Sequence, residues 1–138
     1  MRIVYSYYVL DVIHKGHLLQ MMRGKAIAGK DGVHVVGILT DEAVMEMKPK
    51  PIIPFEERME LAGAIKYVDI VISQDTYSPL PNLYRIQPDV HLESDSHEPE
   101  DIKKVTDYMK KIGGRVIVTP YYPNTSSTRI KQKIKERK

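Results

Sequence analysis

The chain has 138 residues, which suits one compact domain and is too short for two of ordinary size. It contains no cysteine, and this excludes disulfides, thiolate zinc sites and cysteine nucleophiles. Met1 leads directly into a strand-like segment, and no apolar run reaches the roughly 18 residues of a membrane span. We therefore expect a cytoplasmic protein with no membrane partner.

Positive charge is concentrated near the end of the sequence. The net charge is +3, but residues 129–138 carry six basic side chains and one acid, a local charge of +5. Such a segment can contact nucleic acid or a ligand phosphate, or it can be the solvated face of a helix. No aromatic residue is interleaved with these charges to stack on bases, so we do not expect nucleic acid as a partner.

Strand and helix signals alternate from the beginning of the chain. Arg2–Val9 and Val33–Leu39 are rich in β-branched and other apolar residues and predict two buried strands. Between them, apolar residues recur at helical spacing until the turn at Gly29–Gly32. These three segments predict a βαβ unit with a right-handed crossover.

Two helices are expected next. Asp41–Met47 forms the first, which ends at the Lys48–Pro51 segment because its prolines remove backbone donors. Pro54 opens the second and is followed by Glu56 and Glu57 at the positive end of the helix dipole.

The same alternation continues to the end of the chain. Further strands are predicted at Val68–Ile72, Asp89–Leu92 and Arg115–Thr119. Further helices are predicted at Asn82–Ile86, from Ile102 to a stop at Gly113-Gly114, and after the hydroxyl-rich Thr125–Thr128. We therefore predict an α/β fold with a Rossmann-like, doubly wound, five-stranded parallel sheet, in a single domain spanning residues 1–138.

Ligands of open parallel sheets bind at the carboxyl ends of the strands. The first loop at this edge of the predicted sheet holds the densest polar cluster of the sequence. This cluster runs from Asp11 to His17 and leads directly into a helix. His17 lies in the first turn, where backbone N–H groups attract anions, and Gly16 has no side chain to obstruct a phosphate. His14 and His17 can donate hydrogen bonds to phosphoryl oxygens as charge builds up on them.

Other interpretations of the histidines stay open. A His-x-x-His pair can bind a metal, although catalytic zinc needs a third protein ligand and none is evident nearby. The pair can also belong simply to the start of a helix. His34 and His91 lie inside predicted strands and are expected to be packed, whereas His97 follows the fourth strand and stays a candidate.

His14-Lys15-Gly16-His17 has the pattern His-x-Gly-His, and Thr125–Ile130 resembles the pattern Ile-Ser-Ser/Thr-Thr-Lys/Arg-Ile. These two motifs resemble the signatures of the HxGH nucleotidyltransferase superfamily of cytidylyltransferases and related adenylyltransferases. Leu39–Glu42, Glu57-Arg58 and Tyr67–Val71 also resemble family segments, so the resemblance covers nearly the whole chain. Small cytidylyltransferases such as the glycerol-3-phosphate enzyme are similar, as are cytidylyltransferase domains that activate phosphonates.

The resemblance implies a role for each matching residue. His14 and His17 would stabilise the transition state, and Gly16 would permit close packing. Nucleotide phosphates would be bound by Ser126, Ser127, Thr128 and Arg129, by Lys48 or Lys50, and by Arg58. Asp11 would orient substrate or magnesium, Asp41 would hold the acceptor, and Tyr8, Val9 and Asp95 would complete the site. Mg²⁺ would enter with the nucleoside triphosphate, with no protein residue as a dedicated metal ligand.

The sequence departs from the family pattern in four places. Lys66 and Tyr121 stand where the family has arginine. Tyr8-Val9-Leu10 stands where the family has Gly-Thr-Phe, and Ser94-Asp95-Ser96-His97 stands where many relatives have Gly-Asp-Asp-Trp. These differences indicate altered recognition of the acceptor or the base.

The function implied by the resemblance is transfer of CMP from CTP to a small phosphorylated, phosphonate or alcohol acceptor, with release of pyrophosphate. A homodimer is expected, as is common for small members of the family. One alternative is an adenylyltransferase that uses ATP with a phosphopantetheine, flavin or nicotinamide mononucleotide acceptor. Another is a non-catalytic nucleotide sensor whose basic tail binds a partner.

Overall fold

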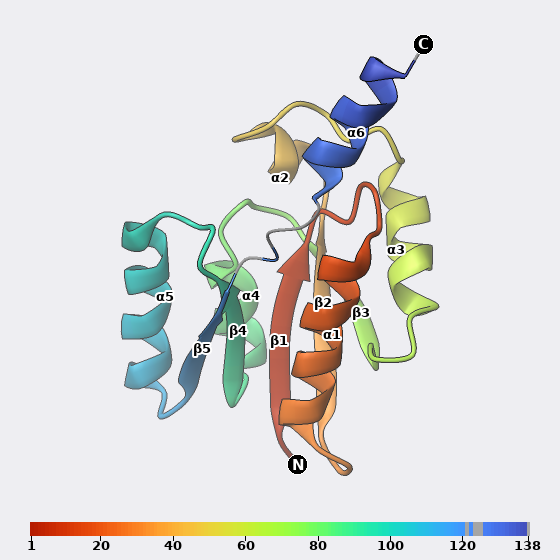
Figure 1. Cartoon of the computed structure of the whole chain (residues 1–138). Coiled ribbons are helices and arrows are strands. Elements are labelled where there is room, and N and C mark those ends of the chain that lie inside the picture. Colours follow the sequence, from red (N-terminus) through yellow and green to blue (C-terminus); the bar gives the residue numbers. More distant parts are fainter. Residues whose placement is uncertain (121, 123–125, 138) are drawn as a thin grey trace.

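The computed structural model describes residues 1–120, 122 and 126–137. One parallel sheet is formed by β1 (Ile3–Tyr8), β2 (Val33–Leu39), β3 (Ile70–Gln74), β4 (Val90–Ser94) and β5 (Arg115–Thr119). Their order is β3-β2-β1-β4-β5, so the chain starts in the middle strand and builds outward in both directions (Figure 1). The predicted Rossmann-like, five-stranded parallel sheet is confirmed.

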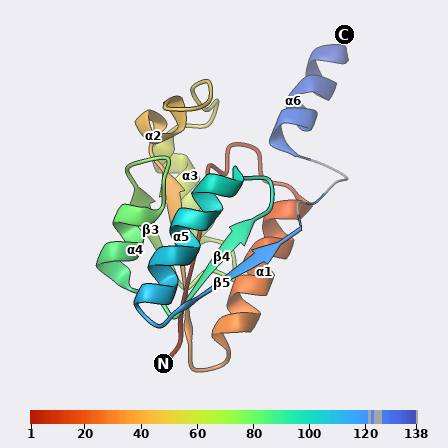
Figure 2. The ribbon, with the colours of Figure 1, turned by 90° about the vertical axis from the view of Figure 1, so that its left-hand side faces the viewer.

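Helices cover both faces of this sheet. One face carries α1 (Lys15–Ala28) and α3 (Phe55–Gly63), and the other carries α4 (Leu80–Ile86) and α5 (Pro99–Lys111). The short α2 (Asp41–Met45) follows β2. The last helix, α6 (Ser127–Glu136), has no buried residue and stands off from the layers beyond the carboxyl ends of the strands (Figure 2).

The alternation of side chains along β2 explains the two layers of core. Val35 packs with Tyr5 and Met109 on the face of α5, whereas Val36 packs with Met21 on the face of α1. Successive residues of a strand point to opposite faces, so a strand that is covered on both sides needs a continuous apolar run.

The structure corrects the boundaries of two strands. The segments predicted as Val68–Ile72 and Asp89–Leu92 are β3 and β4, and both strands begin and end later. Each continues through a buried polar residue: Gln74, which accepts a hydrogen bond from the Tyr5 hydroxyl at 2.6 Å, and Glu93. A search for apolar runs therefore ends both strands too early.

The helix ends follow the predicted signals with three differences. Helix α4 begins at Leu80 rather than Asn82, and α5 begins at Pro99 rather than Ile102. Helix α1 stops at Gly29, whose φ of 79° suits glycine, and Ser126 caps α6. Helix α2 ends at Met45, two residues before the predicted end. Within residues 1–120, 122 and 126–137, no helix is both long and apolar enough to cross a membrane.

Candidate active site

Loops at the carboxyl ends of the strands and the start of α6 enclose a cleft of about 1020 Å³. Most of the predicted site residues line it: Tyr8, Val9, Asp11, His14, Gly16, His17, Lys48, Ser126, Ser127 and Thr128. Thr125 of the second signature lies outside the described residues. Two motifs that are far apart in the sequence thus share one cleft, at the edge of the sheet where open α/β folds bind ligands.

His14 and His17 form a reciprocal cap at the start of α1. Nδ1 of His14 accepts the N–H of Gly16 at 3.0 Å, and Nδ1 of His17 accepts the N–H of His14 at 3.2 Å. Because each Nδ1 is an acceptor, the single proton of each neutral ring lies on Nε2. The two rings, 3.9 Å apart between centroids, therefore each have an Nε2–H donor that capping does not use.

Both imidazoles are neutral at pH 7. Burial lowers the pKa of His14. Burial, together with the neighbouring His14 ring, lowers the pKa of His17 to about 3. The pair therefore offers hydrogen-bond donors to the cleft rather than cations.

Gly16 is required by the ring of His14. A Cβ atom at this position would lie 2.7 Å from Cε1 of His14 and 3.1 Å from Cβ of Tyr122. A larger residue would therefore displace the imidazole from its capping position, a constraint additional to the phosphate approach predicted for Gly16.

The hydroxyl groups at the start of α6 have different partners. Ser126 accepts the N–H of Arg129 at 3.1 Å as the N-cap, and Ser127 donates to the Val12 carbonyl at 2.8 Å. The second bond ties α6 to the loop after β1. Thr128 is exposed, and no hydrogen bond within the described residues uses its hydroxyl. The first turn of α6 and this hydroxyl together suit an anionic ligand.

Asp11 joins three segments of the protein. Its buried carboxylate accepts the N–H groups of Ile52 at 3.1 Å and Ile53 at 2.8 Å, and it pairs with the Lys131 ammonium. Burial acts to raise the pKa of Asp11, but Lys131 and the two backbone N–H groups outweigh burial and lower it. Protein donors therefore contact both carboxylate oxygens, which gives Asp11 a role in holding these segments together, and its contact with substrate or magnesium stays a prediction.

The prediction that Arg58 contacts a phosphate is wrong, because its side chain is completely buried. The guanidinium donates to the carbonyls of Ile53 at 3.0 Å, Val9 at 2.7 Å and Leu39 at 2.8 Å, and pairs with Asp41 at 2.7 Å. It therefore holds the ends of β1 and β2 against the start of α3. Asp41 is engaged in this pair and is not among the residues that line the cleft, contrary to its predicted contact with the acceptor.

The basic residues of α6 are divided between cleft and solvent. Arg129 is exposed and does not line the cleft, and the same is true of Asp95 after β4. Lys131 and Lys135, which we did not single out from the sequence, do line it. They follow Ser127 at steps of four, so helical periodicity within the basic segment was the signal that identifies them.

A second polar cluster lies at the end of β4. The buried carboxylate of Glu93 accepts hydrogen bonds from Nε2 of His91 at 2.9 Å, from the Tyr7 hydroxyl at 3.2 Å and from Nδ1 of His97. Burial acts to raise the pKa of Glu93, but the two histidines outweigh it and hold the pKa at about 2. His34 and His91 are packed in the interior as predicted, whereas His97 lines the cleft.

The chain is similar to known proteins over most of its length. A family model described as cytidylyltransferase-like matches residues 9–133. The chain is 30% identical over 138 residues to the bifunctional protein HldE of Alcanivorax borkumensis, covering 99% of this chain and 28% of that protein. It is 37% identical over 82 residues to the FAD synthase of Methanopyrus kandleri, covering 59% of this chain and 55% of that protein. The chain thus spans only part of the length of these relatives.

The fold also matches a solved structure, that of a lipopolysaccharide core biosynthesis protein from Thermoplasma volcanium. The TM-score is 0.73 at 21% identity, and the match covers 88% of this chain and 97% of the other. The family match spans both motifs that meet in the cleft. The chain therefore belongs to the cytidylyltransferase-like family, within the HxGH nucleotidyltransferase superfamily.

Proposed function

We propose that the protein catalyses, in this cleft, the transfer of a nucleotidyl group from a nucleoside triphosphate to a small acceptor. An oxygen of the acceptor's phosphate, phosphonate or hydroxyl group bonds to the α-phosphorus, the bond from that phosphorus to the bridging oxygen breaks, and pyrophosphate leaves. The observation that carries this proposal is that His14, His17 and the start of α6 line the same cleft.

Different groups around the cleft would bind different phosphates of the nucleoside triphosphate. The Nε2–H groups of His14 and His17 would stabilise the charge that develops on the α-phosphoryl oxygens. The first turn of α6 and Thr128 would bind the β- and γ-phosphates, and Lys48 would offset their charge. No covalent enzyme intermediate is required, since positioning and hydrogen-bond donors suffice for such a transfer.

We propose that magnesium enters the cleft bound to the nucleotide. Within the described residues, no three histidine, aspartate or glutamate side chains come together as metal ligands. The carboxylates of Asp11 and Glu93 are already occupied by protein donors. Magnesium retains waters and is readily held by substrate phosphates, where it neutralises charge. Elemental analysis that finds one tightly held zinc per chain, lost in His14→Ala, would contradict both this proposal and the phosphate role of His14.

CTP is the proposed donor, in line with the cytidylyltransferase-like match, and a homodimer is the proposed assembly. ATP is the second candidate, and the similarity to an FAD synthase favours it, since FAD contains an adenylyl group. The test is pyrophosphate release with CTP and ATP separately, each against a panel of phosphomonoesters, phosphonates and alcohols. Release with only one nucleotide identifies the donor. Tight nucleotide binding with no release for any acceptor would contradict the transferase and support a non-catalytic sensor.

A further inference from the structure

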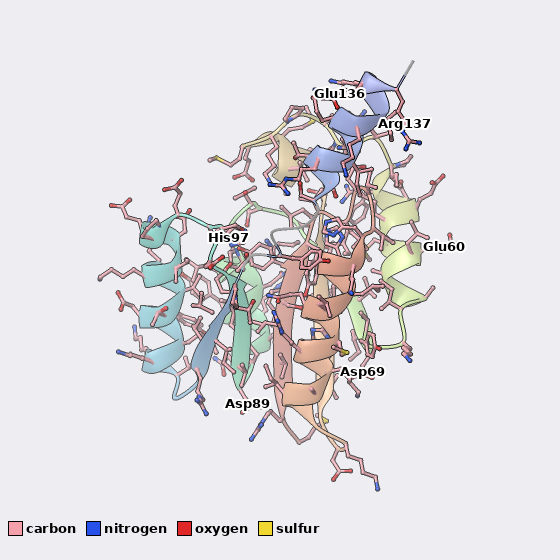
Figure 3. All side chains as sticks on the ribbon, in the orientation of Figure 1. Glu60, Asp69, Asp89, His97, Glu136 and Arg137 are labelled. Atoms are coloured by element: carbon pink, nitrogen blue, oxygen red, sulfur yellow. The ribbon has the colours of Figure 1, made fainter. Side chains whose placement is uncertain are left out.

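The cluster at the end of β4 has no part in the roles given above. Figure 3 shows His97 at the carboxyl-end edge of the sheet, at the opposite end of β4 from Asp89. We propose that His97, held in place by Glu93 and Tyr7, selects an acceptor that carries a hydroxyl group and binds that hydroxyl through Nε2. This inference rests on the proposed nucleotidyl transfer and identifies a specificity residue for its acceptor.

The protein holds His97 through one side of its ring. Nδ1 contacts the Glu93 carboxylate and lies 3.2 Å from the Tyr7 hydroxyl. The rings of Tyr7 and His97 also stack, with centroids 5.5 Å apart and planes 13° apart. Within the part of the chain that the structure describes, no hydrogen bond uses Nε2. The side chain is 26% exposed against 2% for Glu93, so the Nε2 edge is what His97 offers to the cleft that it lines.

Glu93 fixes the tautomer as well as the position of His97. With a pKa of about 2 the carboxylate is ionised at pH 7 and acts only as an acceptor. Nδ1 of His97 must therefore carry the proton of their hydrogen bond. A carboxylate behind one ring nitrogen defines the state of the other nitrogen, which in the neutral ring is a free acceptor.

A hydroxyl group is the ligand that fits Nε2 in either protonation state. Neutral Nε2 accepts a hydrogen bond and protonated Nε2 donates one, and a hydroxyl can do both, whereas an ammonium only donates and a phosphate dianion only accepts. Ser94 and Ser96, whose Oγ atoms lie 2.9 Å apart, also line the cleft and add uncharged polar groups beside His97. The cationic side chains of the cleft belong to other segments, namely Arg23 to α1, Lys131 and Lys135 to α6, and Lys48 and Lys50 to the segment after α2.

The test uses acceptors that match except for their hydroxyl groups. Glycerol 3-phosphate is compared with propyl phosphate, and glucose 6-phosphate with cyclohexylmethyl phosphate, by pyrophosphate release with CTP and with ATP. Wild type is compared with His97→Asn, whose amide N–H can replace Nδ1–H against Glu93 but which lacks the outer edge of the ring. His97→Gln is the rescue variant, because its longer side chain places an amide near the position of Nε2.

We expect wild type to prefer the hydroxylated member of each pair. His97→Asn should raise the KM for that member by about tenfold, the scale of one hydrogen bond. The KM for the deoxy member and the Kd for the nucleotide should stay within about twofold, and His97→Gln should recover part of the loss. Glu93→Gln should weaken the same preference without changing nucleotide binding, whereas a purely structural role would lower Tm and impair both acceptors equally.

A hydroxyl preference that survives in His97→Asn, or its absence in wild type, would overturn the role of His97. So would pyrophosphate release with the deoxy acceptors alone. Nucleotide binding with no release for any acceptor, or no binding of CTP or ATP in calorimetry, would contradict the proposed function itself, so the two failures are distinguishable.

Discussion

The imidazoles of His14 and His17 lie 3.9 Å apart and cap the same helix through their Nδ1 atoms. Capping uses one nitrogen of each ring, and phosphate binding would use the other. The structural interpretation of this His-x-x-His pair and the functional one are therefore compatible. Substitutions can separate the two roles, because a replacement side chain can keep the capping acceptor at Nδ1 and lack the donor at Nε2.

Capping by His14 predicts a difference between two substitutions. Asparagine is a favourable N-cap and alanine is not. His14→Ala should therefore lower the free energy of unfolding by about 1 kcal/mol, whereas His14→Asn should stay within about 0.5 kcal/mol of wild type. Denaturant unfolding measures both values. Equal losses in the two variants would rule out a capping contribution from this side chain.

The depressed pKa of His17 predicts how stability depends on pH. The unfolded chain takes up a proton at His17 below about pH 6.5, whereas the folded chain does so only near its pKa of about 3. The free energy of unfolding should thus fall as the pH is lowered through this interval, by at most about 1.4 kcal/mol per pH unit for this group.

The matched variant for this prediction is His17→Gln, which can still accept the N–H of His14 and does not titrate. Its stability should fall less steeply between about pH 6.5 and 4.5. Glu93 adds little to the slope in this window. Its pKa is lowered on folding, to about 2, so its stabilising charge is fully present above about pH 4.5. Identical slopes for wild type and His17→Gln in this window would contradict the assignment.

Thr128 should bind the β- and γ-phosphates of the nucleotide. Thr128→Val keeps the shape of the side chain and removes its hydroxyl, so affinity for the nucleoside triphosphate should weaken by about 1–2 kcal/mol. Affinity for the monophosphate should change much less. Calorimetry measures both ligands, and Thr106→Val on α5, whose hydroxyl bonds the Ile102 carbonyl, is the matched control. Equal losses for the two ligands would place Thr128 away from the tail.

The pair of Asp11 and Lys131 should connect the stability of α6 to that of the loop after β1. Asp11→Asn leaves two backbone N–H groups and an ammonium without their anionic partner, and should cost about 1–3 kcal/mol of stability. Lys131→Met should cost less, because Lys131 is partly exposed. A double-mutant cycle measures the coupling between them, which should be at least about 0.5 kcal/mol. Simple additivity would show that the contact is not an energetic link.

Local patterns in the sequence predicted the layers of the fold and the two ends of the cleft. The apolar run Val33–Leu39 predicted a strand buried on both faces, and the hydroxyl-rich sequence Thr125–Thr128 predicted the start of the last helix. These signals are local because a strand's burial and a helix's cap depend on residues within one turn or one run.

Such local patterns do not predict polar contacts between residues that are distant in the sequence. An arginine near the start of a helix is expected to be exposed, and only the convergence of three carbonyl groups and Asp41 makes the burial of Arg58 favourable. Asp11 depends in the same way on Lys131, which is distant in the sequence. Both were assigned to ligands because their protein partners cannot be recognised by spacing.

The central claim is that the Nε2–H groups of the histidine pair stabilise the transition state. His14→Asn tests it most directly, because asparagine keeps an acceptor that can cap the helix and has no donor at the position of Nε2. The measurement is the rate of pyrophosphate release at saturating nucleotide and acceptor, together with the Kd of the nucleotide. We predict a rate about 100-fold or more below wild type, with a Kd that changes far less. A correctly folded His14→Asn protein that turns over near the wild-type rate would contradict the account.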